Sequence, residues 1–483
     1  MERSSIRVER VRSVVSRNRL RLLFVAIIFF SVVILVSGAT ADTLSTATEE
    51  DVPLADEADG HTVITESGRA GTITAYAPDG SILYYENERT KYFDVDPVED
   101  DPLTVEYVAT DTVYSGDVCQ DPPCALNVIE RTDLETGETE VLYERYEPQE
   151  TAAEWHDAVR IDDEHFVIAD IYADQVFMVN IETGIIEWTW DAQADFPIEE
   201  AGPYPGDWTH LNDVEYIEDP ESEVDDTIMV SMRNMNQVVF IDPDEGLQEE
   251  WSLGSQDDRD TLFHQHGPDY IPTEDGGPAI LVADSENGQI EEYQREGDEW
   301  VQTWEWSDEW MHWPRSADRL PNGNTLVVDS HGNRVMELTP DDEGGWEAEW
   351  EVGSTMPYDA ERLETGVEST DGQSAQQLGL ESQTPEDVES SGGERESGID
   401  PLGMLISIYH EIGTVIVSFL PLRVHNAILF VSPVWMTTPH FAAVAVGFLT
   451  GVLWTGSEIG WKLRDAGIRS RLPVYREDSE NSE

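Results

Sequence analysis

The sequence of 483 residues predicts an all-β fold, a six-bladed β-propeller with transmembrane helices at its N- and C-termini. Three observations predict this architecture. A pattern of paired strands and polar turns occurs four times between residues 155 and 338, two further strand pairs precede it, and hydrophobic segments lie near both chain ends. Internal repeats of about 50 residues built from short strands are typical of propeller blades.

Each of the four repeats places a His or Arg before an Asp and a hydrophobic strand, and ends its second strand in a polar turn. The openings are His156-Asp157-Ala158, His210-Leu211-Asn212-Asp213, His266-Gly267-Pro268-Asp269 and Arg315-Ser316-Ala317-Asp318. The closing turns begin at Asp170, Met232, Asp284 and Asp329, which gives periods of 62, 52 and 45 residues.

Two strand pairs, residues 71–87 and 127–146, extend the pattern toward the N-terminus. Each alternates apolar and polar residues about a turn, Pro78-Asp79-Gly80 in the first pair and Glu135-Thr136-Gly137 in the second. Alternation of this kind predicts β-hairpins. Together with the four repeats, these pairs give six blades over residues 65–357, with five or seven blades as alternatives at about 50 residues per blade.

The chain has 101 acidic and 27 basic residues, a formal charge of −74, and its only lysines are Lys91 and Lys462. Like charge at this density opposes compaction at ordinary ionic strength, whereas molar salt shortens the Debye length to about 3 Å. We therefore expect a salt-adapted source. The 15 Trp, 16 Tyr and 13 Phe argue against an acidic disordered protein. Without a basic patch, nucleic acid is not an expected partner.

Residues 1–41 are expected to be a basic N-terminus followed by a transmembrane anchor or a signal peptide. Seven arginines within residues 1–21 precede the apolar run Leu22–Val36. About 20 apolar residues span a bilayer, and the flanking arginines should stay in the cytoplasm. Ala39-Thr40-Ala41 also fits a cleavage site. Either alternative predicts a protein of the cell membrane with its propeller on the extracytoplasmic side.

Two acidic, polar linkers are expected to flank the propeller, residues 42–64 and a disordered segment at residues 358–400. A hydrophobic membrane region follows over residues 401–458, with apolar runs at 401–420, 427–435 and 441–454. The final segment, residues 459–483, is basic and then acidic. Because its basic part should lie in the cytoplasm, one or three C-terminal crossings are expected.

Cys119 and Cys124 are the only two cysteines of the chain. In an exported protein the simplest interpretation is a disulfide that pins a loop. A redox or metal site is the weaker alternative, because no further thiol or nearby His completes a ligand set.

The first strand of each propeller blade lines the central channel, so residues at one repeat position converge at one mouth of the channel. The candidates are the blade-opening His156, His210, His266 and Arg315, the turn residues Arg233 and His331, and the preceding His264 and His312. Imidazole and guanidinium groups together suit an anionic oxyacid, and His adds a general base and a nucleophile. The alternative is that these side chains only hydrogen-bond neighbouring blades.

The recurrent Asp157, Asp213, Asp269 and Asp318 are expected to fix turns or blade contacts rather than to act in catalysis. Seven tryptophans near the ends of the repeats are expected to pack between blades: Trp188, Trp190, Trp251, Trp304, Trp306, Trp346 and Trp350. A metal on His210 with Asp213, or on His266 with Asp269, would lack a tight ligand motif. We therefore expect no metal and no cofactor.

Four segments resemble the arylsulfotransferase (aryl-sulfate sulfotransferase) family: THLNDVEYI at 209–217, VSMRNMNQVVFID at 230–242, FHQHGPDYI at 263–271 and WPRSADRLPNGNTLVVDSHGNRVMELTP at 313–340. The resemblance covers about residues 150–355. With the charge and the hydrophobic termini, it suggests a haloarchaeal-type, membrane-anchored member.

The resemblance implies a six-bladed propeller that moves a sulfuryl group from an aryl sulfate donor to a phenolic acceptor, without the nucleotide sulfate donor. In that family a channel His takes the group covalently, and other His residues and an Arg hold the sulfate oxygens. The resemblance implies that His210 and His266 are the best-matched channel histidines and that Arg233 is the oxyanion clamp. The family's nucleophile lies on a later blade, where this chain offers His312, Arg315 or His331.

We therefore expect catalytic roles for His210, His266, His312 and His331, and substrate binding by Arg233, Arg315, His156 and His264. The chain departs from the family pattern at Arg315, which opens a blade in place of a His, so the nucleophile could be displaced or missing. Two alternatives stay open: a non-catalytic propeller that binds a ligand or a surface partner, and a metal-dependent hydrolase or lactonase on the same fold.

Overall fold

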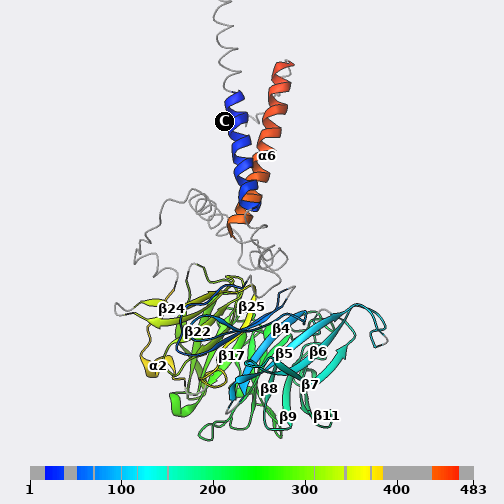
Figure 1. Ribbon diagram of the computed structural model, residues 1–483, viewed down its shortest axis with the longest axis vertical. Coiled ribbons are helices and arrows are strands. Elements are labelled where there is room, and N and C mark those ends of the chain that lie inside the picture. The colour runs from blue at the N-terminus through cyan, green and yellow to red at the C-terminus, as the bar shows by residue number, and fades with distance from the viewer. Residues whose placement is uncertain are drawn as a thin grey trace, which may run out of the picture. The chain divides into compact units, whose positions relative to one another are not determined.

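The computed structural model describes residues 17–36, 52–68, 71–98, 101–116, 118–149, 152–308, 310–341, 345–369, 372–384 and 438–466. These residues form two compact units, a six-bladed β-propeller and a pair of helices (Figure 1). The predicted all-β fold with six blades is confirmed.

Each blade is an antiparallel sheet whose strands follow one another in sequence, except in the first blade. The first blade contains β25 (Pro357–Arg362), β1 (Thr62–Glu66), β2 (Ile73–Tyr76) and β3 (Ile82–Glu86). The second contains β4 (Lys91–Val98), β5 (Asp101–Val113), β6 (Cys124–Asp133) and β7 (Glu138–Glu147). The third contains β8 (Trp155–Arg160), β9 (His165–Asp170), β10 (Gln175–Asn180) and β11 (Ile185–Asp191).

The remaining three blades follow the same plan. The fourth contains β12 (Leu211–Tyr216), β13 (Ile228–Met232), β14 (Gln237–Asp242), β15 (Gly246–Leu247) and β16 (Leu253–Gly254). The fifth contains β17 (His266–Ile271), β18 (Ala279–Asp284), β19 (Gln289–Glu296) and β20 (Glu299–Trp306). The sixth contains β21 (Pro314–Arg319), β22 (Thr325–Asp329), β23 (Arg334–Pro340) and β24 (Trp346–Gly353).

The inner strands of the six blades are β25, β4, β8, β12, β17 and β21, and each contacts the inner strands of its two neighbours. They therefore surround the channel. The ring is closed by β25, which pairs antiparallel with β1, with Thr62 opposite Arg362 and Ile64 opposite Ala360. The first blade thus takes its inner strand from a segment almost 300 residues later in the sequence.

The hydrophobic core lies between blades rather than within them. Blades three and four share one cluster with Trp190 and Trp208, and blades five and six share another with Trp304 and Trp306. The predicted packing of the repeat tryptophans between blades is confirmed for this pattern, with Trp251 and Trp350 in two further clusters. Because a tryptophan buries a large apolar area, these contacts stabilise the blade order.

Substitution of Trp304 by Ala is expected to lower the free energy of unfolding by about 3–5 kcal/mol, the usual cost of removing a buried aromatic side chain. Trp304 is 1% exposed and its ring lies 5.5 Å from that of Trp346. Denaturant titration measures the loss. The matched control is Val301→Ala on the same strand, whose side chain is 38% exposed and whose change should stay within about 0.5 kcal/mol.

The expected linkers are structured where they meet the propeller. Residues 358–362 belong to β25, α2 (Ala375–Leu378) packs on the cluster between blades five and six, and Ser307 N–H donates to the Gln383 carbonyl oxygen. The sequence interpretation failed because it assigned Asp359 and Glu361 to solvent, whereas both line the channel. At the other end, the Trp350 indole N–H donates to the carbonyl oxygen of Asp56 at 3.0 Å, within the expected 42–64 linker.

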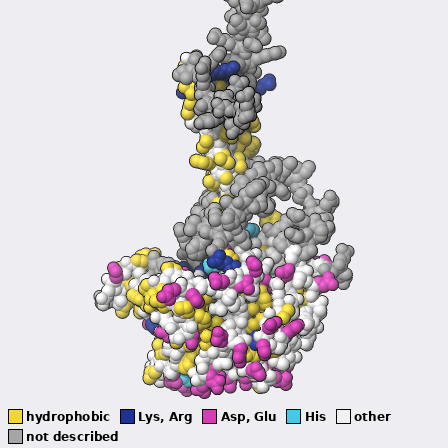
Figure 2. Space-filling view, turned by 180° about the vertical axis from the view of Figure 1, so that it is seen from behind, with side chains coloured by type: hydrophobic (Ala, Val, Ile, Leu, Met, Phe, Trp, Pro, Cys, Tyr) yellow, Lys and Arg dark blue, Asp and Glu magenta, His cyan; other side chains and the backbone are white. Residues whose placement is uncertain are grey.

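Cys119 and Cys124 are joined by a disulfide, with their Cα atoms 5.9 Å apart. The bond closes the connection between β5 and β6. Acidic side chains are spread over the visible face of the propeller, and basic and His side chains gather at one place on its edge (Figure 2).

The second unit pairs a helix over Arg17–Val36 with α6 (Thr438–Asp465), and both helices are long and apolar enough to cross a membrane. The helices are antiparallel, because Arg17 forms an ion pair with Asp465 at 2.8 Å while Ile34 packs on Ala442 and Ala443. The arginines of the first helix therefore lie beside the charged end of α6. The expected apolar runs at 401–420 and 427–435 lie outside the described residues.

Candidate active site

The strand registers determine which channel residues are equivalent from blade to blade. Trp155 lies opposite Asp170 and Pro314 opposite Asp329, and Leu211 lies opposite Met232. The residues that follow these three are His156, Arg315 and Asn212, so these occupy one position. His266 shares it, since it pairs with Ala283, the residue before Asp284. Tyr358 does too, since Pro357 pairs with Glu66.

His210 belongs to a different position from the other blade openings. It lies one residue before Leu211 and is therefore equivalent to His264 and Trp313. The backbone agrees, because the φ angles of His210, His264 and Trp313 are 52°, 53° and 55°, in the left-handed region that is uncommon for such residues. The single column expected from the sequence is thus two neighbouring rings.

The two rings nevertheless bring the blade-opening side chains together. The ring centroid of His156 lies 5.3 Å from those of both His210 and Tyr358, and His266 lies 6.4 Å from Tyr358. The guanidinium of Arg315 lies 4.9 Å from the centre of the Tyr358 ring. Tyr358 is therefore in contact with side chains from three other blades.

Arg233 joins this group from the turn after β13. Its guanidinium lies 5.6 Å from the centre of a Trp313 ring, and that ring lies 6.4 Å from His266. The positive charge of Arg233 lowers the pKa of both His210 and His266. We call His156, His210, His266, Arg233 and Arg315 the His/Arg cluster.

The hydrogen bonds of His266 determine its tautomer. Its Nδ1 lies 2.8 Å from the Ser285 hydroxyl, and that hydroxyl donates its own hydrogen to the carbonyl oxygen of Pro314 at 2.6 Å. Ser285 must therefore accept from Nδ1–H. Burial, then Arg315 and Arg233, lowers the pKa of His266 well below its ordinary value. The ring is neutral at pH 7, with a lone pair on Nε2.

His210 is oriented by a carboxylate. Its Nδ1 lies 2.6 Å from Oδ1 of Asp207, so Nδ1–H donates and Nε2 carries the lone pair. Burial and Arg233 lower the pKa of His210, and Asp207 opposes this shift. An imidazole held in this way by a carboxylate has the arrangement of a general base.

Arg233 and Arg315 form no ion pair with any described residue. Arg233 donates only a long bond of 3.4 Å to Asn234, and Arg315 donates to the Ser67 hydroxyl at 2.7 Å. The Nε–H groups of both are buried without a partner among the described residues. Burial lowers the pKa of Arg315 to about 10, so it is still charged at pH 7. A guanidinium with unused donors suits an oxyanion.

The other three predicted site residues occupy different places. His331 stacks on Trp313 at 5.2 Å and so adjoins the cluster through that ring. The Nδ1 of His264 lies 3.5 Å from a carboxylate oxygen of Glu286. His312 precedes β21, where its Nδ1 lies 2.6 Å from the carbonyl oxygen of Trp310.

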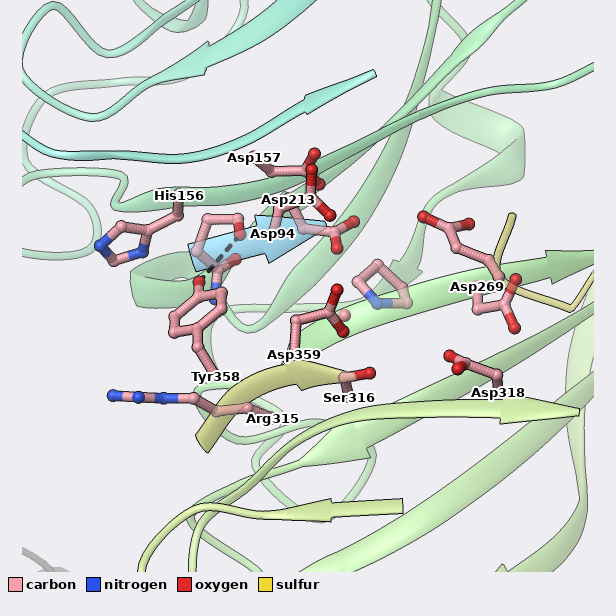
Figure 3. Close-up of a pocket in the computed structure, with 14 residues that line it drawn as sticks. Asp94, His156, Asp157, Asp213, Asp269, Arg315, Ser316, Asp318, Tyr358 and Asp359 are labelled. Atoms are coloured by element: carbon pink, nitrogen blue, oxygen red, sulfur yellow. Dashed lines mark hydrogen bonds between the residues drawn. The ribbon is translucent and has the colours of Figure 1, made fainter. Parts of the chain in front are cut away.

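Tyr358 was not predicted from the sequence. It is 6% exposed and stands between the His/Arg cluster and the carboxylates (Figure 3). Its hydroxyl lies 3.3 Å from the carbonyl oxygen of Asn212, to which it donates. The signal was the Pro-Tyr-Asp sequence at 357–359, which repeats the short opening of an inner strand but lies in a segment interpreted as linker.

A carboxylate pocket lies along the channel on the other side of Tyr358. The pocket is lined by Asp94, Asp157, Asp213, Asp269, Asp318, Asp359 and Glu368, and also by His156 and Arg315. Figure 3 shows His156 and Arg315 at one end and the carboxylates extending toward Asp269 and Asp318. Burial and mutual repulsion raise the pKa values of these acids, to about 7 for Asp157.

Some of these acids hold blades together, as the sequence predicts for the recurrent Asp. Asp157 accepts the Val214 N–H at 2.7 Å, and Asp359 accepts the Val95 N–H at 3.2 Å, in each case from the next inner strand. The predicted metal alternatives on His210 or His266 do not form, since their Nδ1 atoms bind Asp207 and Ser285.

A comparison with protein families matches residues 156–274 to the arylsulfotransferase (ASST) family. The matched segment includes four of the five members of the His/Arg cluster. At the level of the family, the match supports sulfuryl transfer with an aryl sulfate donor and a phenolic acceptor. No curated protein matches the chain.

Solved structures with a similar fold are distant in sequence. A protein of unknown function from Bacteroides caccae is 12% identical, with a TM-score of 0.43 over 62% of this chain and 97% of its own. The periplasmic gluconolactonase of Pseudomonas aeruginosa is 12% identical, with a TM-score of 0.38 over 64% and 99%. A virginiamycin B lyase from Staphylococcus aureus is 12% identical, with a TM-score of 0.36 over 61% and 83%.

Proposed function

We propose that the propeller transfers a sulfuryl group from an aryl sulfate to a phenol through a covalent sulfohistidine at His266, without a nucleotide donor. One observation carries the proposal. Two buried guanidinium groups that form no ion pair with described residues lie beside neutral histidines, in a chain of net charge −74 whose central segment matches the arylsulfotransferase family.

The charge of the chain makes this cluster informative. The described arginines Arg89, Arg131, Arg145, Arg160, Arg319, Arg334 and Arg362 all form ion pairs with carboxylates. Arg233 and Arg315 do not, although burying a charge without a partner is costly. A bound oxyanion supplies the partner, and a sulfate ester presents the oxygen atoms that a guanidinium recognises.

In the first step, the Nε2 lone pair of His266 attacks the sulfur of the donor. A nitrogen–sulfur bond forms, the bond between sulfur and the phenolic oxygen breaks, and the phenolate leaves with the electron pair. The imidazole becomes positively charged, and Ser285 stabilises it by accepting the Nδ1–H. Arg233 and Arg315 balance the charge on the equatorial sulfuryl oxygens, where fixed donors contribute most.

In the second step, His210 removes the proton of the acceptor phenol. The phenolic oxygen attacks sulfur, the nitrogen–sulfur bond breaks, and His266 regains its lone pair. His210 then releases its proton to water. Asp207 positions His210 by fixing the tautomer with Nδ1–H.

We also propose that the two apolar helices anchor the chain in a membrane, with the propeller on the extracytoplasmic side and in a salt-rich medium. The support is the length and apolar character of both helices and the arginines that flank the first. Protease digestion of intact cells tests the side: cleavage of the propeller from outside supports it, and protection until lysis contradicts it.

The activity is tested with the full chain purified in detergent at high salt. A chromogenic aryl sulfate is supplied with and without a phenol, and the sulfated phenol is measured. Product that requires the acceptor supports transfer. Hydrolysis that a chelator abolishes indicates a metal-dependent hydrolase, and binding without turnover indicates a ligand-binding propeller; both outcomes contradict the proposal.

Substitution of Arg233 by Met is expected to lower kcat/KM by about 10²–10³-fold, the cost of removing one donor to a developing oxyanion. Arg233→Lys should recover only part of the rate, because an ammonium lacks the planar fork. The control is Arg259→Met, an exposed arginine 5.3 Å from Phe263, which should leave the rate unchanged. Equal losses in both variants would contradict a specific role.

A further inference from the structure

We propose that the propeller channel binds a hard divalent cation, with Ca²⁺ as the ligand of choice, between the carboxylates of Glu215, Asp269 and Glu368. One oxygen from each of these side chains lies within 4.8 Å of the others. Oxygens on opposite sides of Ca²⁺ are separated by about 4.6–5.2 Å, since each Ca²⁺–oxygen bond is about 2.3–2.6 Å. The three oxygens are therefore close enough to share one ion.

The three ligands come from separate parts of the fold. Glu215 is on β12 and Asp269 is on β17, whereas Glu368 follows β25 and is not part of a blade. The segment after β25 returns to the channel, where the Glu368 N–H donates to Glu361 at 3.0 Å and the Ser369 N–H donates to Asp269 at 3.3 Å. It thereby adds a further carboxylate to a channel already lined with them.

Glu368 is held there in an unfavourable backbone conformation. Its φ angle is 48°, in the left-handed region, which costs a non-glycine residue free energy unless the surroundings compensate. Repulsion from Glu215 and Asp269 adds to this cost, and it raises the pKa of Glu368 further after burial. A cation between the three carboxylates would supply the missing compensation.

Asp318 gives independent support. It is 4% exposed, lines the same pocket as Asp269 and Glu368, and forms no hydrogen bond or ion pair with any residue that the structure describes. Figure 3 shows its carboxylate beside that of Asp269. A buried carboxylate without a partner is costly, and Asp318 is placed to complete the ligand set directly or through a water molecule.

The neighbouring cation does not neutralise this group. Arg319 follows Asp318 in β21, but its guanidinium donates to Glu292 at 2.9 Å with both side chains fully buried. The ligands of the proposed site are carboxylate oxygens only, without His or Cys. Such a set suits Ca²⁺ rather than Zn²⁺ or copper, and more than three protein oxygens with flexible spacing favour Ca²⁺ over Mg²⁺.

The site is independent of the proposed sulfuryl transfer, because its residues lie on the other side of Tyr358 from the His/Arg cluster. We expect it to stabilise the closed ring, since one ion would connect β12, β17 and the segment after β25.

The experiment uses the full chain in detergent with molar KCl, so that weak cation binding by surface carboxylates is saturated. Chelator-treated protein is dialysed against Ca²⁺ or Mg²⁺, the bound metal is measured by elemental analysis, and Tm is recorded. The wild type should hold one Ca²⁺ per chain more than Glu368→Gln. At Ca²⁺ about 100-fold above Kd, its Tm should rise by about 5 °C.

Glu368→Gln keeps the shape of the side chain and removes one repulsive charge. Its metal-free form should therefore melt at least as high as the metal-free wild type, while its Tm no longer responds to Ca²⁺. Asp318→Asn should weaken Ca²⁺ binding in the same way. Glu381→Gln, an exposed acid on the same C-terminal segment, is the control and should behave as the wild type.

Two outcomes would overturn the proposal. In one, wild type and Glu368→Gln bind equal Ca²⁺ while both are folded by circular dichroism, and only acidification raises Tm, which would mean that protons neutralise the carboxylates. In the other, Mg²⁺ stabilises the protein and Ca²⁺ does not.

Discussion

Substitution of His266 by Asn should lower kcat for sulfuryl transfer by at least about 10⁴-fold, because loss of a covalent nucleophile leaves only binding and electrostatic stabilisation. The proposal assigns the attack to Nε2 of His266, whose Nδ1–H is held by Ser285 at 2.8 Å. Single-turnover kinetics with a chromogenic aryl sulfate measure the loss. Mass spectrometry under alkaline conditions should find an acid-labile sulfuryl group on the wild type and none on the variant.

Two other histidines give matched tests of that assignment. His331→Asn and His312→Asn should each retain the covalent intermediate, because His331 adjoins the cluster only through Trp313 and His312 binds the carbonyl oxygen of Trp310. Ser285→Ala should slow transfer without abolishing it, because the nucleophile is present but its tautomer is no longer fixed. An intermediate that persists in His266→Asn and disappears in His331→Asn would move the nucleophile to His331.

Substitution of His210 by Ala should lower kcat by about 10²–10⁴-fold, the usual contribution of a general base. The loss should be restricted to the transfer half-reaction. Release of the first phenolate, observed as a burst, should be kept, while sulfation of the acceptor slows. A variant that loses the burst as well would show that His210 acts before the intermediate forms.

The pH profile of the wild type gives a second test of His210. Burial and the charge of Arg233 lower its pKa below the ordinary value, and Asp207 and Glu154 oppose this shift; His156, 5.3 Å away, is itself neutral because burial lowers its pKa. The base must be neutral, so transfer should be constant at pH 7 and fall as the pH decreases through that lowered pKa. Asp207→Asn should move the break to still lower pH. A break above pH 7 would contradict the role.

The number of blades was predictable because each repeat has its own hydrophobic strands, and repeats of similar length are visible without knowledge of contacts. The tryptophans were predictable for the same reason, since large apolar side chains at the ends of repeats pack against the next blade. Closure by β25 was not predictable from composition. Pro357–Arg362 is a single strand without a hairpin partner next to it, and its two acids face the channel.

The candidate site was predictable as a group of residue types, whereas its arrangement was not. The sequence pointed to His156, His210, His266, Arg233 and Arg315, and the structure places them near one another, although their roles stay predictions. The register differs because the pairing of β12, β17 and β21 shifts at irregularities near their starts, which no spacing rule reveals. The carboxylate pocket was missed because Asp and Glu in so acidic a chain look like surface.

The closing strand also determines when the site can exist. Tyr358, which contacts the His/Arg cluster, follows Pro357 at the start of β25, and Arg362 at its end binds the hydroxyl of Thr62, 300 residues earlier. During synthesis and export, the first blade therefore lacks its inner strand until nearly the whole propeller has emerged. Loop closure over such a distance is slow relative to local pairing. A chain interrupted before residue 357 would present an open ring with an unpaired β1 edge and an incomplete pocket, a distinct target for proteolytic quality control.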